Sequence, residues 1–243
     1  FRLAIHEPTA SAVIADVHLG YREARRQTGD AVPLLDVAAQ LAPLGRARRR
    51  FAFERLVVAG DLFERSVDRK LLDQFLGELQ LLSIAFAGLI PGNHDRGWET
   101  LRQIVPVHPE GLTLGAWRVV HQESVATTLD SDEALARAKD ASKFVLGHWH
   151  PAVRHQGRRV PCYLVGADRL ILPAFSADAA GVVTPRSQAE LGNEASWHGL
   201  RRIGINAGRL VDCGVPTTNE NPRRRLRGLR RETGIAGSVD RYQ

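Results

Sequence analysis

The stretch KFVLGHWH, residues 143–150, passes from a short apolar run directly into two histidines that flank a tryptophan. In an extended chain, side chains two positions apart leave the same face, so His148 and His150 could hold a single site. The apolar run has the length of a buried strand, and the histidines follow its carboxyl end. The stretch therefore predicts a strand that delivers imidazoles to one edge of a sheet.

The same arrangement, a buried-type strand followed by polar residues, recurs upstream at residues 11–16, 55–61, 83–95 and 117–122. Helix-like stretches separate these strands. One covers residues 30–50 with Pro33 near its start, one runs from Ser66 as N-cap to Gln80, and one opens at Ser131. The alternation of strands and helices predicts an α/β architecture. In the first of these helices we expect Asp30 to act as a cap and Asp36 to lie on a solvated face.

The texture changes after His150 to strands and turns, ending in a predicted hairpin over residues 201–214. Residues 184–198 have no regular pattern, and the chain from residue 217 onward has the composition of a disordered tail. We predict one domain over residues 1–214 and an Arg-rich tail over residues 215–243.

Composition limits the classes of protein that fit. The chain has 243 residues, 44% of them hydrophobic and 25% charged, which is ordinary for a soluble globular protein. No apolar stretch has the length of a membrane helix, and the start of the chain lacks the layout of a signal peptide. Cys162 and Cys213 form no CxxC pair, so neither a disulfide framework nor a thiolate zinc site is indicated. We expect a cytoplasmic protein, and the absence of methionine indicates a fragment or a trimmed chain.

The net charge of +6 suggests an anionic partner, and nearly all of the positive charge is arginine. Arginine suits bidentate contacts with phosphate. Two clusters stand out, and the competing interpretations are a solvated helix end for the first and a disordered tail for the second. They comprise Arg46, Arg48, Arg49 and Arg50, and then Arg223, Arg224, Arg225, Arg227, Arg230 and Arg231.

Polar residues gather where the predicted strands end, which is where open α/β sheets place their sites. Oxygen and imidazole donors without sulfur suit Mn, Fe, Zn or Ni. Seven donors exceed the needs of one tetrahedral ion but fit two ions that share a carboxylate, about 3.5–4 Å apart, as in enzymes that cleave phosphate esters. The polar residues at these strand ends are Asp16 and His18, then Asp61, then Asn93, His94 and Asp95, then His121, and finally His148 and His150, and the seven donors are drawn from these nine.

These blocks, DVH, GD, GNHD, a lone His and GHWH, resemble in their order the pattern of the calcineurin-like metallophosphoesterases. A narrower resemblance runs through GHWHPAVR, RVPCYLVGADRLILPAFS and GRLVDCG to the ligase-associated DNA damage response endonuclease (PdeM) group. The resemblance implies an αββα fold, a two-layer β sandwich flanked by helices. It also implies a hydrolase of phosphodiester bonds, a metal-dependent DNA nuclease, with two divalent ions, Mn²⁺ first among them. A DNA ligase, an exonuclease and a helicase are typically encoded beside members of that group.

The family roles carry over onto matching positions. Asp16, His18, Asp61 and His150 would hold one ion, and Asp61 would bridge to a second ion held also by Asn93, His121 and His148. His94 would face the scissile phosphate as the acid, supported by Asp95. Arg22, Arg25 and Arg96 lie near motifs and are candidates for phosphate contact. The two cations would acidify a bridging water into the attacking hydroxide.

Other interpretations of these residues remain open. A small-molecule phosphodiesterase or phosphatase, for cyclic nucleotides for example, would use the same site. A metal-stabilised binding scaffold is a different class, and the complete ligand set counts against it. We assign no role to His6, His108, His155 or His198, and we expect Trp149 to pack rather than to stack on a base.

Overall fold

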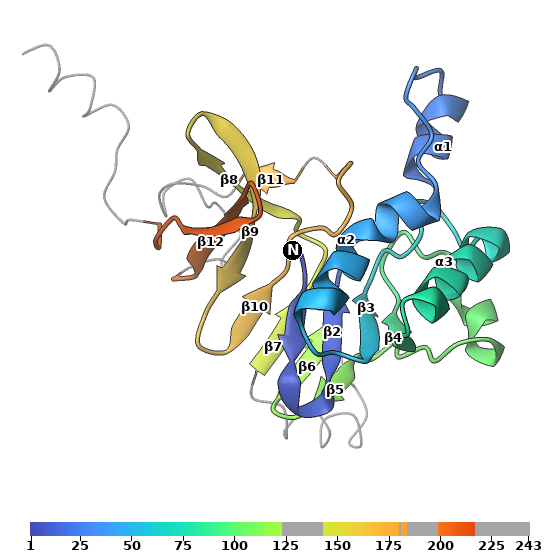
Figure 1. Cartoon of the computed structure of the whole chain (residues 1–243), viewed down its shortest axis with the longest axis horizontal. Helices are drawn as coiled ribbons and strands as arrows, with labels where there is room; N and C mark the ends of the chain where they lie inside the picture. The colour runs from blue at the N-terminus through green and yellow to red at the C-terminus, as the bar shows by residue number, and fades with distance from the viewer. Residues whose placement is uncertain (123–142, 180, 184–198, 217–243) are drawn as a thin grey trace, which may run out of the picture.

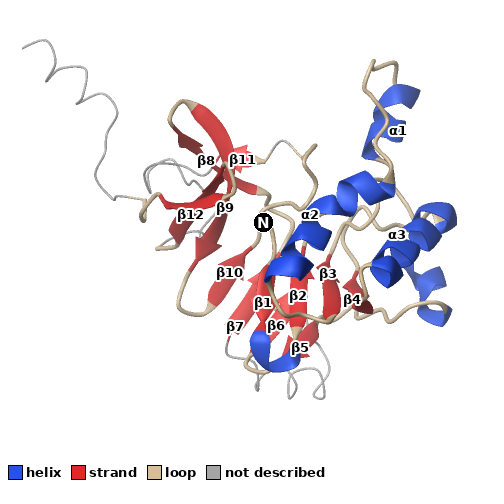
Figure 2. Cartoon of the chain, viewed as in Figure 1, coloured by secondary structure: helices blue, strands red, loops and turns tan. Residues whose placement is uncertain are grey.

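The structure is a computed structural model that describes residues 1–122, 143–179, 181–183 and 199–216. Two β-sheets pack face to face, and helices cover the outer face of the first (Figures 1 and 2). The first sheet has the order β1-β2-β3-β4, in which β2, β3 and β4 are parallel and β1 is antiparallel to β2. Its strands are β1 (Ala4–His6), β2 (Ser11–Ile14), β3 (Arg55–Ala59) and β4 (Ala85–Ile90).

The second sheet has the order β11-β8-β9-β10-β7-β6-β5, and a β12–β13 hairpin joins it through pairing of β12 with β9. Its strands are β5 (Leu112–Leu114), β6 (Trp117–Val120), β7 (Lys143–Leu146), β8 (Pro151–His155), β9 (Arg158–Val165), β10 (Arg169–Ile171), β11 (Val182–Val183), β12 (Arg201–Asn206) and β13 (Arg209–Asp212). Pairs β6–β7 and β7–β10 are parallel, so the ends of β6 and β7 point to the same edge.

Alternation along the central strands explains why the sheets are buried on both faces. In β2, Ile14 packs toward the helices while Val13 packs toward the second sheet, and in β3 Val58 and Val57 divide in the same way. Side chains alternate between the two faces of a strand, so a continuous apolar run fills both cores. The cluster between the sheets also includes Val119, Val145 and Tyr163 from the second sheet, among others.

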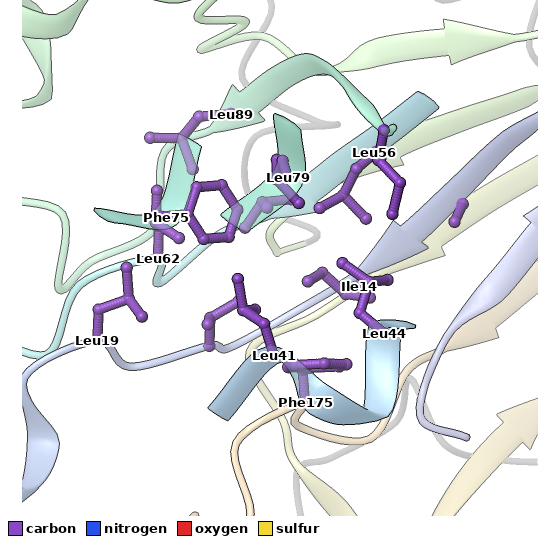
Figure 3. Close-up of a cluster of buried hydrophobic side chains, with 14 of the residues drawn as sticks. Ile14, Leu19, Leu41, Leu44, Leu56, Leu62, Phe75, Leu79, Leu89 and Phe175 are labelled. Atoms are coloured by element: carbon purple, nitrogen blue, oxygen red, sulfur yellow. The ribbon is translucent and has the colours of Figure 1, made fainter. Parts of the chain in front are cut away.

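The helices are α1 (Tyr21–Gln27), α2 (Val37–Arg50) and α3 (Arg69–Leu81), with short 3₁₀ turns η1 (Glu7–Thr9) and η2 (Trp98–Gln103). Helix α3 buries Leu72, Phe75 and Leu79, whose spacing puts them on one face. Leu41 and Leu44 of α2 meet the same cluster, as Figure 3 shows. This layer anchors the first sheet from outside, so that its strand ends are held firmly.

The predicted α/β architecture is confirmed, but the helix starts differ. Residues 30–50 do not form one helix, because α2 begins only at Val37, where the Asp36 carboxylate caps it by accepting from Ala39 N at 2.6 Å. Asp36 is thus the cap and Asp30 is not. Asp30 instead pairs with Arg25 of α1, a helix that the sequence pattern did not predict.

The second helix also begins later than predicted. Its cap is Asp68, which accepts from Leu71 N at 3.1 Å, and not Ser66. The side-chain oxygen of a capping residue must reach a backbone N–H two or three positions later in the chain. Asp68 is nearer than Ser66 to the apolar residues of the helix and therefore caps it. The helix predicted from Ser131, residues 184–198 and the Arg-rich tail lie outside the described residues.

The five predicted strands before His150 are confirmed as β2, β3, β4, β6 and β7, and the predicted C-terminal hairpin is β12–β13. In the part of the chain that the structure describes, no helix has the length and apolar character needed to span a membrane.

Candidate metal centre

The predicted site residues meet at one edge of the sandwich, just beyond the carboxyl ends of β2, β3, β6 and β7. Asp16 follows β2, Asp61 follows β3, His121 follows β6, and His148 and His150 follow β7. Parallel strands end at the same edge, so residues far apart in the chain come together there. Two donor groups form: Asp16, His18 and His150, and Asp61, His121 and His148, with the donor atoms of each group within 4.8 Å of one another.

Backbone conformation aims these side chains. Among the described residues, nine other than glycine have positive φ, and five of the nine are predicted ligands. Left-handed conformations in residues with a Cβ are disfavoured and tend to concentrate at functional sites. The five are Asp16, His18, Asp61, His148 and His150, with φ between 45° and 71°.

Distances between donor atoms fit shared cations. Two donors held at about 2.1 Å from one ion at tetrahedral or octahedral angles lie about 3.0–3.5 Å apart. In the first group, His150 Nε2 lies 3.4 Å from Asp16 Oδ1 and 3.5 Å from His18 Nε2. In the second, His121 Nε2 lies 3.2 Å from His148 Nδ1 and 3.5 Å from Asp61 Oδ2. Asn93 Oδ1 also lies 3.2 Å from His121 Nε2.

The proton positions support the same conclusion for His121. Its Nδ1 lies 3.0 Å from the carbonyl oxygen of Ala59, which can only accept, so Nδ1 carries the proton. In the neutral ring Nε2 is then a lone pair, and it faces other lone-pair atoms of Asn93 and Asp61. Converging acceptors without a donor between them are what a cation site requires.

Asp16 and Asp61 are buried and connect the site to the surrounding backbone. Both carboxylate oxygens of Asp16 accept from His148 N at 3.1 Å, which ties the end of β7 to the end of β2. Asp61 Oδ1 accepts from His94 N at 2.8 Å. The structure brings Asp61 into the second group, and its bridging to a first ion stays a prediction.

The pKa values of the two histidines that follow β7 shift in opposite directions. Burial lowers the pKa of His148, and the nearby His121 lowers it further. Burial also acts to lower the pKa of His150, but the hydrogen bond and negative charge of Asp16 outweigh it and the net shift is upward. The two rings differ because His150 accepts the favourable influence of the Asp16 carboxylate as its dominant electrostatic contact, whereas burial dominates at His148.

His94 and Asp95 have separate partners. The Nδ1 of His94 contacts the carbonyl oxygen of Glu64, while Asp95 accepts from the backbone N–H groups of Phe63 and Gly92, each at 2.9 Å. The ring support that the sequence suggested from Asp95 is thus supplied by the Glu64 backbone. Asp95 instead fastens the GNHD loop to the loop after β3, and burial raises its pKa to about 6.

Glu64 is a site residue that the sequence interpretation missed. Its Oε2 lies 3.0 Å from Nδ1 of the buried His18, and with His18 and His94 it forms a third group of donors. The pair is close but makes no aligned hydrogen bond among the described residues, so the carboxylate acts on the second nitrogen of this predicted ligand through its negative charge. The available signal was its place three residues after Asp61, in GDLFE.

The candidate arginines differ in availability. Arg22 Nε is bound to Asp178 at 2.8 Å and Arg25 Nε to Asp30 at 2.6 Å, so both have a carboxylate partner already. Arg96 is exposed and two residues from His94. Trp149 packs against the outer cluster of the second sheet and edge-on to the His148 ring, as the packing interpretation predicted.

The first arginine cluster lies far from the donors. Arg46 to Arg50 form the end of α2, just before β3 begins, whereas Asp61 follows the other end of β3. Five strand residues separate the two ends by about 16 Å. The cluster therefore does not line the site, and Arg50 instead lies over the Phe51 ring at 5.6 Å.

Known proteins provide an independent comparison. No protein-family model matches the sequence, and no curated protein matches it either. Among solved structures, the chain is similar to the nuclease MPE of Pseudomonas putida, with a TM-score of 0.61, 20% identity, and coverage of 87% of this chain and 91% of that one. The chain has the calcineurin-like metallophosphoesterase fold.

Two further similarities are weaker. A predicted phosphoesterase from Streptococcus pneumoniae matches with a TM-score of 0.33 and 14% identity, covering 81% of this chain and 82% of that one. Vps29 of Chaetomium thermophilum also has a TM-score of 0.33, with 16% identity, covering 72% of this chain and 76% of that one. The predicted fold has helices on both outer faces of the sandwich. In the described residues, helices cover the outer face of the first sheet, and the helix predicted from Ser131 lies outside those residues.

Proposed function

We propose that this chain is a metal-dependent phosphodiesterase that cuts DNA. The observation that carries the proposal is the pair of donor groups at the strand ends, with donor atoms 3.2–3.5 Å apart and His94 beside them. Asp16, His18 and His150 would hold one divalent ion, and Asp61, Asn93, His121 and His148 the other, with Asp61 shared. Mn²⁺ is the proposed metal, and the donor types also accept Fe, Zn or Ni.

Bound divalent ions would neutralise the phosphate oxygens and acidify a water for attack. The protein's own contribution to bond cleavage is a proton. Because His94 Nδ1 is engaged by the Glu64 carbonyl, Nε2 is the nitrogen left to give a proton to the departing oxygen. The hydrogen bond from His94 N to Asp61 Oδ1 holds the His94 backbone beside the metal donors, and the contact of Nδ1 with the Glu64 carbonyl oxygen orients the ring.

Two observations favour DNA over a small nucleotide. The chain carries a net charge of +6, and the structural neighbour from Pseudomonas putida is a nuclease. A small-molecule phosphodiesterase remains the second candidate because the donor groups would serve it equally. A cytoplasmic location and a functional link to a DNA ligase, an exonuclease and a helicase stay predictions.

An activity panel tests the proposal. Purified protein is incubated with Mn²⁺ and, separately, with single-stranded DNA, duplex DNA, a 2′,3′-cyclic nucleotide and bis-p-nitrophenyl phosphate. We expect hydrolysis of bis-p-nitrophenyl phosphate and of DNA, both abolished by chelation. Cleavage of the cyclic nucleotide without cleavage of DNA would transfer the assignment to the second candidate. Inactivity on every diester would refute the phosphodiesterase itself.

A further inference from the structure

A cavity of about 520 Å³ opens between helices α1 and α3. Its walls also include the chain just before α2 and the loop that follows β3. Figure 1 shows α1 projecting beyond the layer of α2 and α3, so the cavity lies at the rim of that layer. None of the seven predicted metal ligands lines it, and it is therefore a space distinct from the donor groups.

One wall of the cavity joins the two loops that carry site residues. Glu64 N donates to the carbonyl oxygen of Leu19 at 3.0 Å, and Leu19 comes directly after the DVH block. Val67 N donates to the carbonyl oxygen of Arg96 at 3.0 Å, just after the GNHD block. Glu64 also holds the ring of His94 through its carbonyl oxygen. In the proposed reaction His94 gives a proton to the departing oxygen, so the leaving part of a substrate would lie nearest to this wall.

The lining carries more negative than positive charge. Four acids and two bases give a formal charge of −2, from Glu23, Asp36, Glu64 and Asp68 against Arg65 and Lys70. Asp36 and Asp68 cap helices, and each helix end offsets about half a charge, which leaves the sum negative. The cavity therefore repels a phosphate group but accepts an uncharged one. A diester whose phosphate binds at the donor groups would extend an uncharged part into it.

The uncharged groups of the lining suit a nucleobase. Leu34, with 55% of its surface exposed, and Leu71 provide apolar contact. Gln27 of α1 and Gln74 of α3 line the cavity with amides that make no side-chain hydrogen bond within the described residues. An amide both donates and accepts, as the edge of a base does. Sites that take up a base combine such groups with apolar side chains, and small-molecule sites measure about 300–1,000 Å³.

We infer that this cavity binds the nucleoside on the leaving side of the scissile phosphate, with its base between Gln27 and Gln74; this inference rests on the proposed function. A base must leave the stack of a duplex to enter such a site. The substrate class is therefore a diester whose leaving nucleotide is unpaired, as in single-stranded DNA. A diester without a base would still reach the metal donors but would gain nothing from the cavity.

Two glutamines of one helix provide the test. Gln74→Ala removes an amide from the cavity, and Gln80→Ala removes the same group from the last turn of α3, outside the cavity. The substrates are a thymidine dinucleotide and its analogue in which hydrogen replaces the base of the leaving nucleoside, identified from the products. A lost hydrogen bond weakens binding by about 2–10-fold, so Gln74→Ala should raise KM for the dinucleotide by that factor without lowering kcat. The rise should disappear on the analogue, and Gln80→Ala should match the wild type on both.

The outcomes separate the cavity from the catalytic centre. An equal rise of KM on both substrates, or no rise on either, would overturn the cavity as a nucleoside site while leaving the phosphodiesterase intact. Faster cleavage of duplex than of single-stranded DNA by the wild type would do the same, and so would hydrolysis of bis-p-nitrophenyl phosphate without hydrolysis of the dinucleotide. Wild-type inactivity on every diester would instead refute the proposed function. Alanine is favourable at both exposed helix positions, so Tm should stay at or above the wild-type value in both variants.

Discussion

Gly60 is the residue at which a single methyl group should dismantle half of the metal centre. It adopts φ 87°, and a Cβ added there would lie 1.9 Å from Nδ1 of His121. Heavy atoms in contact normally stay about 3.5 Å apart, so the His121 ring must retreat by about 1.5 Å in Gly60→Ala. That movement breaks the 3.0 Å hydrogen bond from Nδ1 to the Ala59 carbonyl. It also withdraws Nε2 from the second donor group.

The consequences can be given magnitudes. A residue with a Cβ in the left-handed region costs about 1–2 kcal/mol, which for a domain of this size lowers Tm by about 2–8 °C. Loss of the support that orients a metal-bound histidine costs about 10–100-fold in metal affinity or activity. We therefore expect Gly60→Ala to fold, melt slightly earlier, and bind Mn²⁺ in the second group at least 10-fold more weakly. Metal analysis after dialysis and thermal melts by circular dichroism measure both effects.

A glycine elsewhere provides the matched control. Gly77 lies inside α3, and a Cβ added there meets nothing within 4 Å. Glycine inside a helix costs up to about 1 kcal/mol relative to alanine, so Gly77→Ala should raise Tm and leave the metal content unchanged. If Gly60→Ala binds Mn²⁺ as tightly as the wild type and keeps its activity, the His121 ring is not needed in the second donor group and the assignment fails.

Three other changes probe the remaining parts of the site. Asp61→Ala should lower the Mn²⁺ content from about two ions per chain. It should also lower the stabilisation that Mn²⁺ gives, which is about 2.7 kcal/mol for each site at a hundredfold excess over Kd. A wild-type stoichiometry of one ion with full activity would refute the two-ion centre. His94→Ala should retain metal while turnover collapses, less so for aryl esters, whose leaving groups hardly need a proton, and equal loss on alkyl and aryl esters would argue against the acid. The third change concerns pH. Burial raises the pKa of Asp95 from 3.8 to about 6, so metal-free wild-type protein should lose stability relative to Asp95→Asn as pH rises from about 4 through 6. The total is on the order of 3 kcal/mol, and denaturant unfolding in which the difference does not change with pH would contradict it.

The donor residues could be predicted because their signals are local. A buried strand followed at once by DVH, GD or GHWH predicts both the position of these residues, at the end of a strand, and the donor atoms that they place there. Parallel pairing then forces the strand ends to one edge, so the sequence needs no further information to bring Asp16 near His148. Helix starts were less secure because Asp30, Asp36, Ser66 and Asp68 are all good caps. Only the position of the packed face selects Asp36 and Asp68.

The roles of the arginines could not be predicted because their signals are not local. An arginine that is near a motif in the sequence can still form its ion pair with a carboxylate far away in the chain. Arg22 and Arg25 lie close to the DVH block, yet each is bound to a carboxylate, and the partner of Arg22, Asp178, is 156 residues away. The four clustered arginines of α2 lie beyond the far end of β3. Charge density along the chain is thus a poor guide to the binding surface of this protein.

The place of Arg154 is likewise set by strand register. Arg154 attracts no attention in the sequence, because AVRHQGRRV has the composition of any exposed hairpin. Once Val153 is paired with Val160 in the core, alternation commits Arg154 and Arg159 to the face that reaches His150, and opposes them to each other. Composition does not reveal this placement, because a shift of one residue in register would send the same arginines to the opposite face. The position of an arginine relative to the predicted metal ligands therefore follows from strand pairing rather than from the number of arginines nearby in the sequence.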